Sequence, residues 1–310
     1  MPELPEVTTT TKGLQRILPG LTITDVWTDL ASKNQKLKQF KETIKNDVFF
    51  KKFKKEVVGA KVLSVTRRAK NILINLSNNK TILIHLKMTG HIMGGRYVYN
   101  KKENKWYPDK AERSSLHDPY NRFVHVVFTL SNGKHFVMSD SRKFGKVTIL
   151  DTRTLDQTIH LKDVGPEPLE KSFTFLKFQE RLLLKKNKSI KTVLMDQSVI
   201  AGIGNIYSDE MLWLAGIHPE SKPVKIPKSC LEILYKNMKE VLKKGIDLGG
   251  DSMSDYRNVN GERGKFQNHH NVYRKTGERC SKRGCQGVII RKVVNGRSAH
   301  FCNIHQKLYK

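Results

Sequence analysis

The sequence predicts an α+β protein built from three successive parts: a β-rich domain, a helical domain and a small metal-binding finger. Three observations lead to this fold class. Short apolar runs of strand length fill much of residues 57–150. Longer segments with apolar residues at helical spacing follow the Pro- and Gly-containing stretch "DVGPEPLEKSF". Three of the four cysteines crowd into the last 31 residues.

The first domain is predicted to cover residues 1–150. It begins with an amphipathic helix in "PEVTTTTKGLQRILPG", where Pro5 suits the first turn and Gly20 the end. The apolar residues expected to share one face of this helix are Val7, Leu14, Ile17 and Leu18. Strands are expected at "KVLSV", "NILINL", "TILIHL", "RFVHVVFTL", "KHFVMSD" and "KVTIL", with a hairpin turn at Asn132-Gly133.

A linker at residues 151–172 is predicted to lead into a helical domain at residues 173–275. Helices are expected in "SFTFLKFQERLLLKK", "SIKTVLMDQ", "NIYSDEMLWLAG" and "SCLEILYKNMKEVLKKG". The polar segment that follows, "LGGDSMSDYRNVNGERGKFQNHHN", is predicted to be a mobile loop, because few of its residues would enter a core.

The finger, at residues 276–310, has the ligand spacing of a zinc site. A C-x4-C pair and a C-x2-H pair flank a hairpin made of "VIIRKVV", Asn295-Gly296 and "RSAHF". The predicted ligands are Cys280, Cys285, Cys302 and His305. They fill all four tetrahedral positions, so the one zinc ion would be structural. His300 is a competing ligand, but it lies inside the second strand.

The charge of the chain favours a polyanionic partner. Lys and Arg number 57 against 29 Asp and Glu, which gives a net charge of +28. A solvated, lysine-rich surface is the alternative explanation. Arg297 follows the turn of the finger hairpin, where it is well placed to meet a groove or a phosphate. No run approaches the roughly 18 apolar residues of a membrane span, no secretory signal is visible, and the few cysteines indicate a reducing compartment.

The opening stretch "MPELPEV" offers a candidate nucleophile. Removal of Met1 would free the nitrogen of Pro2, and an α-amino group with a pKa of ~8 is partly neutral at physiological pH. A nearby cation such as Lys70 would favour the neutral form further. Attack of this secondary amine on a sugar aldehyde carbon gives a charged iminium, which is an electron sink for phosphate elimination. Glu3 would supply the acid or base, whereas an inert terminus is the alternative.

Several motifs together resemble one family. "PELPEV", "RRAKNILI", "HLKMTG", "DSRKFG", "GPEPL", "GIGNIY" and the terminal finger occur in the order found in the formamidopyrimidine-DNA glycosylase (Fpg/Nei) family, from residue 2 to residue 310. The resemblance implies an N-terminal β-sandwich with flanking helices, a helix–two-turn–helix DNA-binding domain with a lesion-recognition loop, and a C-terminal β-hairpin zinc finger. With Leu4 in "PELPEV", the chain resembles the formamidopyrimidine branch of the family, because the endonuclease VIII branch usually has glycine at this position.

The resemblance also implies an activity and a set of functional residues. The activity is removal of oxidised purines, notably 8-oxoguanine and formamidopyrimidines, from damaged double-stranded DNA, followed by β- and δ-elimination at the abasic site. The catalytic residues implied are Pro2, Glu3, Lys70 and Arg297. The DNA-binding residues implied are Met88, Arg142 and Phe144, which would fill the hole left by the flipped base, and Asn205, His125 and Lys191, which would contact the backbone. For Lys191, a plain surface lysine is the alternative.

The chain departs from the family pattern at a few positions. Phe123 stands where relatives have the first histidine of "HDHV", and Thr8 replaces a common acidic residue. Residues 94–121 form an insert, in which "KKENKW" and "DPYNR" indicate a solvated loop. The fourth zinc ligand is usually cysteine, and here it is His305.

Two alternative functions stay open at this point. One is an endonuclease VIII-like specificity for oxidised pyrimidines, and the other is a non-catalytic binder of damaged DNA. The expected protein is a cytoplasmic monomer without membrane contact that associates with the nucleoid through DNA. The segment "SDYRNVNGERGKFQNHH" is a candidate cover for the flipped base.

Overall fold

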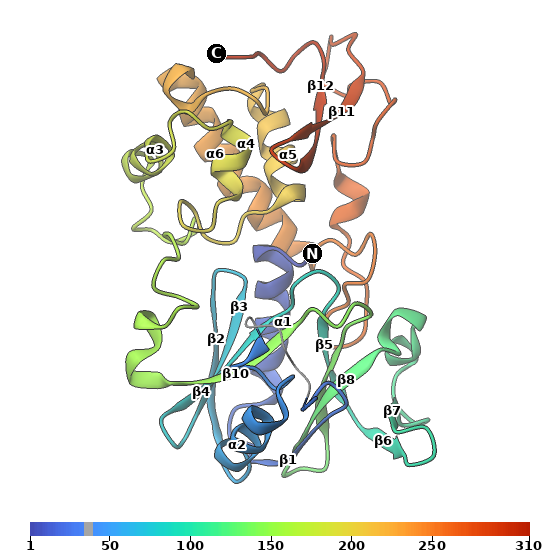
Figure 1. Cartoon of the computed structure of the whole chain (residues 1–310). Helices are drawn as coiled ribbons and strands as arrows, with labels where there is room; N and C mark the ends of the chain where they lie inside the picture. The colour runs from blue at the N-terminus through green and yellow to red at the C-terminus, as the bar shows by residue number, and fades with distance from the viewer. Residues whose placement is uncertain (34–39) are drawn as a thin grey trace. The chain divides into compact units, whose positions relative to one another are not determined.

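The computed structural model describes residues 1–33 and 40–310, and its contacts divide the chain into two compact units (Figure 1). The first unit comprises Met1–Lys162 and Leu248–Lys265, and the second comprises Asp163–Asp247 and Phe266–Lys310. The segment 248–265, which the sequence assigned to the helical domain, thus packs with the first unit. Within the described ranges, no helix has the length and apolar character that crossing a membrane requires.

The first unit is a sandwich of two four-stranded antiparallel sheets, in the strand orders β1-β8-β9-β5 and β10-β4-β3-β2. The strands of the first sheet are β1 (Ile23–Thr28), β5 (His91–Gly95), β8 (Val124–Leu130) and β9 (His135–Ser139). Those of the second are β2 (Val62–Arg68), β3 (Asn71–Leu76), β4 (Lys80–His85) and β10 (Lys146–Asp151). All six predicted strands are confirmed. The turn at Asn132-Gly133 closes the β8–β9 hairpin, with Gly133 at φ 73°.

The core of this unit lies between the two sheets and is closed by helices. Apolar side chains of both sheets pack with Val7 and Leu14 from α1 (Leu4–Ile17) and with Leu18, which caps the end of this helix. Ile17 was expected on the same face, but 38% of it is exposed. Helix α2 (Asp47–Val57) was not predicted; it inserts Phe53 and Val57 into the core and is capped by Asn46, whose side chain accepts the Phe49 N–H at 2.9 Å.

Two segments of the first unit differ from their predicted character. The insert contains the hairpin β6 (Tyr97–Asn100) and β7 (Lys105–Pro108) and the short 3₁₀ helices η2 (Ser114–His117) and η3 (Pro119–Asn121), so it is not a plain loop. The polar segment after the last helix was expected to keep out of the core, and that expectation is wrong. Tyr256 and Val259 are each 5% exposed, and Val259 belongs to the sandwich core.

The second unit combines four helices with the finger hairpin in its described residues. The helices are α3 (Phe175–Leu183), α4 (Ile190–Met195), α5 (Asn205–Ala215) and α6 (Lys228–Asp247), all at predicted positions. The hairpin is β11 (Ile289–Val294) and β12 (Arg297–Cys302), with Val294 paired to Arg297. Asn295 and Gly296 both have positive φ, at 47° and 75°, as the predicted tight turn requires.

Candidate functional site

The amino-terminal stretch is held in a buried network at the start of α1. Pro2 is buried, and Glu3 is only 2% exposed. The Glu6 carboxylate accepts the Glu3 N–H at 2.7 Å through Oε2 and the Asp251 N–H at 2.7 Å through Oε1. Glu6 therefore fixes the backbone beside Pro2 and links it to the segment 248–265.

Lys70 lies at the end of the sheet towards which the amino end of α1 points. Gly20 donates its N–H to Val62 O at 2.9 Å, and Gln15 Nε2 donates to Val65 O at 2.7 Å, so α1 runs antiparallel to β2. The helix from Gln15 back to Leu4 and the strand from Val65 on to Lys70 each span about 16 Å. The β2–β3 turn that carries Lys70 is therefore level with the start of α1.

The surroundings of Lys70 are both buried and cationic. Lys70 is 5% exposed and follows Ala69, whose φ is 52°. Burial, reinforced by Lys87 and Lys70, lowers the pKa of His85 to about 3. His85 is thus neutral at physiological pH, and its Nδ1 accepts the Lys87 N–H at 3.0 Å. The positive charge at this end of the second sheet is therefore carried by lysines such as Lys70 and Lys87, and His85 adds none.

Two loops bring the predicted base-replacing residues Met88, Arg142 and Phe144 to the same place. Thr89 donates its hydroxyl to the Asp140 carboxylate, which joins the β4–β5 loop to the β9–β10 loop. The Arg142 guanidinium lies 4.6 Å from the centre of the Phe144 ring, and Phe144 is 44% exposed. Met88 is half-buried, and it does not belong to the sandwich core. An exposed ring, a stacked guanidinium and a thioether therefore share one edge of the sandwich.

Asp140 organises these loops, and sequence reasoning did not single it out. Its carboxylate accepts the Gly145 N–H at 2.6 Å and the Arg142 N–H at 3.3 Å in addition to the Thr89 hydroxyl. Lys45 Nζ supports the same loop by donating to Lys143 O at 2.6 Å, and burial lowers the pKa of Lys45 to about 8. The loop geometry thus depends on one buried carboxylate.

Replacing Asp140 by asparagine is expected to lower the free energy of unfolding by roughly 1–3 kcal/mol, because an amide group cannot accept all three donors. Urea unfolding of the variant and the parent measures this difference. Asp156→Asn, at an exposed position, is the control and should change stability little. Equal effects of the two substitutions would show that Asp140 does not organise the loops.

Asn205 begins α5 in the second unit, as predicted. It follows Gly204, and the preceding turn is tied by Gln197, which accepts the Gly202 N–H at 2.9 Å and donates to Ile203 O at 2.8 Å. The Asn205 Oδ1 atom is buried and has no hydrogen-bond partner within the described residues. The first N–H groups of a helix and a side-chain amide are suited to an anionic ligand.

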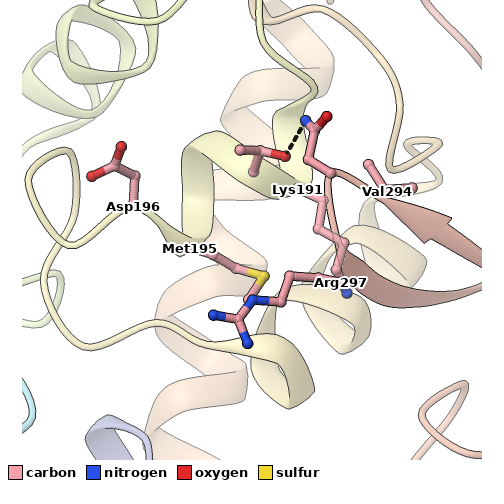
Figure 2. Close-up of a pocket in the computed structure, with 7 residues that line it drawn as sticks. Lys191, Met195, Asp196, Val294 and Arg297 are labelled. Atoms are coloured by element: carbon pink, nitrogen blue, oxygen red, sulfur yellow. Dashed lines mark hydrogen bonds between the residues drawn. The ribbon is translucent and has the colours of Figure 1, made fainter.

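Arg297 lines a pocket of about 220 Å³ between the finger hairpin and α4 (Figure 2). Figure 2 shows its guanidinium beside the Met195 thioether. The tip of the hairpin is held in place because Asn295 Nδ2 donates to Thr192 Oγ1 at 2.8 Å. The arginine is exposed at the start of β12, so it is available to an anion.

Lys191 lines the same pocket as Arg297, but it is not a plain surface lysine. Its side chain is 1% exposed, and its amino group donates to the equally buried Asp209 carboxylate, so the surface interpretation is wrong. Asp209 Oδ2 also accepts the His300 N–H at 3.0 Å and lies 3.0 Å from His300 Nδ1. Asp209 therefore ties α4 and α5 to the strand that begins with Arg297.

His125 is also more buried than a simple phosphate contact would suggest. It is 9% exposed, its Nδ1 lies 2.9 Å from both Asp29 oxygens, and its backbone oxygen accepts the Thr28 hydroxyl at 2.7 Å. Its Nε2 atom is buried without a partner in the described part of the chain. Asp29 orients the imidazole, and Nε2 is the atom left for a ligand.

The four predicted metal ligands come together. The ligand atoms of Cys280, Cys285, Cys302 and His305 lie within 4.8 Å of one another, and this group can hold a metal ion. Cys285 Sγ is 3.6 Å from Cys302 Sγ, close to the edge of about 3.8 Å in a tetrahedron with metal–sulfur bonds of about 2.3 Å. His305 Nε2 lies 3.0 Å from Trp213 O, so Nε2 carries the proton and Nδ1 faces the sulfurs. His300 takes no part.

Family models match both halves of the chain. The formamidopyrimidine-DNA glycosylase N-terminal domain matches residues 1–147, and the formamidopyrimidine-DNA glycosylase H2TH domain matches residues 164–257. The chain belongs to the formamidopyrimidine-DNA glycosylase family. The second match corresponds to the predicted helix–two-turn–helix part of this fold.

Relatives of this family cover the chain nearly from end to end. The formamidopyrimidine-DNA glycosylase of Pelotomaculum thermopropionicum is 37% identical over 310 residues, which is 99% of this chain and 100% of the relative. That of Bacillus subtilis is 33% identical and covers 97% of this chain and 98% of its own length. The Lactococcus lactis enzyme in complex with DNA containing an abasic site has a TM-score of 0.80 at 30% identity, and covers 98% of this chain and 99% of its own. A mutant of the Lactococcus lactis enzyme in complex with DNA containing Fapy-dG has a TM-score of 0.81. This match covers 99% of this chain and 100% of the mutant chain.

Proposed function

We propose that this protein is a base-excision repair enzyme that removes oxidised purines, notably 8-oxoguanine and formamidopyrimidines, from duplex DNA and then nicks the abasic site. Family membership supports a glycosylase acting on damaged DNA. The observation that carries the finer proposal is the buried terminus, where Glu3 and the backbone after Pro2 are fixed by Glu6. An inert chain terminus has no need of such fixation.

In the proposed reaction, Pro2 is the nucleophile once Met1 has been removed. Its neutral secondary amine attacks the C1′ carbon of the sugar, and the departing base receives a proton from Glu3. Glu3 then takes back the proton that the Pro2 nitrogen loses and passes it to O4′ as the C1′–O4′ bond breaks, which opens the sugar ring and leaves an iminium. The iminium withdraws electrons, so loss of a C2′ proton expels the 3′ phosphate, and a further elimination expels the 5′ phosphate. Lys70 lies at the same height along the sandwich as the start of α1, and further cations surround it. Their positive charge favours the neutral form of the Pro2 amine and attracts the DNA phosphate.

Met88, Arg142 and Phe144 would occupy the space that the flipped base vacates. Extruding a base loses stacking and pairing worth a few kcal/mol, and an aromatic or apolar wedge recovers part of it. The exposed Phe144 ring stacked under Arg142 supports this assignment. The guanidinium can also donate hydrogen bonds to the unpaired partner base.

The backbone of the DNA would be held by Asn205, Arg297 and His125. Asn205 offers helix N–H groups, Arg297 a charge at the hairpin tip, and His125 an unpaired Nε2 atom. Lys191 would lie beside this contact, because it lines the same pocket as Arg297, and its pairing with Asp209 also holds the strand of Arg297 in position. We also propose that the ion in the finger is zinc, which would supply folding free energy only, because the protein fills every ligand position.

A lesion panel tests the proposed activity. Duplexes with 8-oxoguanine, a formamidopyrimidine, thymine glycol or a preformed abasic site are incubated with the chain, and nicking is followed on denaturing gels. The proposal expects cleavage of both purine lesions and of the abasic site, with the pyrimidine lesion cut more slowly. Preference for thymine glycol would assign the endonuclease VIII-like specificity. Tight binding to every duplex without nicking would mean that the protein is a non-catalytic binder.

Cys302→Ser is expected to abolish stoichiometric zinc binding, because Cys302 is fully buried among the ligands. Elemental analysis should give about one zinc ion per parent chain and far less in the variant. Cys230→Ser is the matched control, since Cys230 lies in α6 outside the ligand group. A parent chain that purifies with intact fold but binds no zinc would refute the assignment.

A further inference from the structure

The insert, residues 94–121, contacts another segment of the first unit. Its last part, residues 113–121, lies against the segment 248–265, which belongs to the same unit. We call residues 113–121 the brace and residues 251–261 the cover segment. The brace is fixed to the sandwich, because Asn121 Oδ1 lies 2.9 Å from His91 Nε2 in β5.

A partly buried ion pair joins the brace to the cover segment. Asp118 accepts hydrogen bonds from Arg257 Nε at 3.1 Å and from Arg257 Nη2 at 3.1 and 3.2 Å. The Arg257 side chain is 3% exposed and that of Asp118 is 24% exposed. Arg257 Nη1 also donates to Ser254 O and Tyr256 O, at 2.9 Å each. The guanidinium therefore fixes the backbone of the cover segment as well as the pair itself.

A second set of contacts holds the tip of the cover segment. Ser115 Oγ donates to Asn260 O at 2.6 Å, and Arg113 Nη1 donates to Asn260 Oδ1 at 2.6 Å. Gly261 has φ 80°, and a Cβ atom there would lie 2.7 Å from Ser115 O. The two backbones are thus as close as a glycine allows.

The other end of the cover segment meets the proposed catalytic terminus. Asp251 donates its N–H to Glu6, and the Tyr256 hydroxyl donates to Glu6 O at 3.1 Å. Glu6 in turn accepts the Glu3 N–H. One chain of contacts therefore runs from the brace, through Arg257 and Tyr256, to the residue that fixes Glu3.

We propose that the brace sets the position of the cover segment against a flipped base, and that Asp118 and Arg257 are positioning residues for base recognition. This inference rests on the proposed function above. A segment tied at both ends is ordered before the substrate binds, so less conformational freedom is lost when a base enters beside Glu3. An abasic site carries no base, so its cleavage depends on the Glu3–Glu6 contact, which does not involve Asp118 or Arg257.

The test compares two substrates for each variant. Asp118→Asn and Arg257→Met are assayed on an 8-oxoguanine duplex and on a preformed abasic duplex. We expect kcat/KM on 8-oxoguanine to fall on the order of tenfold, because the competent segment is then only fractionally populated. Abasic-site nicking should stay within about twofold of the parent. The double variant should lose no more than the worse single variant, because both changes break one pair.

Arg153→Met is the matched control, since it breaks another arginine–aspartate pair of the same unit. In that pair Arg153 donates to both oxygens of Asp151, and its side chain is exposed. It should leave both activities unchanged. Equal losses on both substrates, or no loss on 8-oxoguanine, would overturn the proposal.

Amide hydrogen exchange tests the same proposal without an activity measurement. In Asp118→Asn, the amide of Asp251 should exchange faster, whereas the core amides of β3 and β4 should not change. Unchanged exchange at Asp251 would also overturn the proposal. A parent chain that nicks neither duplex would refute the proposed function instead, and the exchange arm would still decide whether the brace holds the segment.

Discussion

A chain that carries an extra residue before Pro2 is expected to lose abasic-site nicking by at least roughly 10³-fold, because removing a catalytic nucleophile costs this much or more. Acylation turns the Pro2 nitrogen into a tertiary amide, whose lone pair is delocalised and which cannot form an iminium. Met1 is 38% exposed, so a short extension can pass into solvent without disturbing the buried residues that follow. The loss should therefore be chemical and not structural.

The same preparation supplies its own control. A protease site placed directly before Pro2 allows the extension to be removed, and nicking should return in proportion to the fraction of chains with a free Pro2. Nicking rates and N-terminal sequencing, taken at the same time points, measure this relation. Full activity before cleavage would remove Pro2 from the mechanism.

Asp209→Ala is expected to lower the free energy of unfolding by about 3–5 kcal/mol, the range found when one partner of a buried pair is removed. Lys191 would be left as a buried cation, and the His300 N–H would lose its acceptor. Because these groups lie on α4, α5 and β12, the loss should disturb the position of Arg297 as well. Urea unfolding measures the stability, provided that metal content is held constant.

Glu220→Ala is the comparison for Asp209. Glu220 pairs with Lys292 of the same hairpin at 2.7 Å, but both side chains are substantially exposed, and such pairs contribute about 0–1 kcal/mol. Lys191→Met combined with Asp209→Leu should recover much of the lost stability, since apolar residues can replace a buried pair. Similar losses for Asp209→Ala and Glu220→Ala would contradict the role assigned to Asp209.

Much of the fold could be predicted because local sequence signals agree with the tertiary structure. The alternating and continuous apolar runs mark six of the sandwich strands, and the Asn-Gly pairs at 132–133 and 295–296 mark two hairpins. Helix α2 escaped prediction because "DVFFKKFKKEV" carries its few buried residues, Phe53 and Val57, among many lysines. Its capping residue, Asn46, was the available signal.

The cover segment shows where sequence reasoning fails. Its residues are mostly polar, and Ser252 is buried with its hydroxyl donating to Tyr256 O inside the segment. Arg257 and Tyr256 are buried because contacts from the brace and from α1 satisfy their polar groups. These partners lie up to 250 positions away in the sequence. No local sequence pattern predicts that a polar segment will be buried by hydrogen bonds to residues far away in the sequence.

The candidate site was predictable in its reactive groups but not in their support. Cysteine and histidine spacing located the finger residues that come together in a group able to hold a metal ion, and the unusual amino terminus pointed to Pro2 and Glu3 as candidates. The supporting carboxylates Asp140 and Asp209 act on donors from other elements, so neither stands out in the sequence. The burial of Lys191 likewise depends on its distant partner.

Borohydride trapping on lesion DNA, followed by mapping of the modified peptide, tests the central claim most directly. The chain is incubated with an 8-oxoguanine duplex and sodium borohydride, and the covalent product is digested and analysed by mass spectrometry. The proposed mechanism predicts a DNA remnant on the peptide that begins with Pro2. A chain that excises the base but forms no adduct, or forms it on Lys70, would contradict the mechanism.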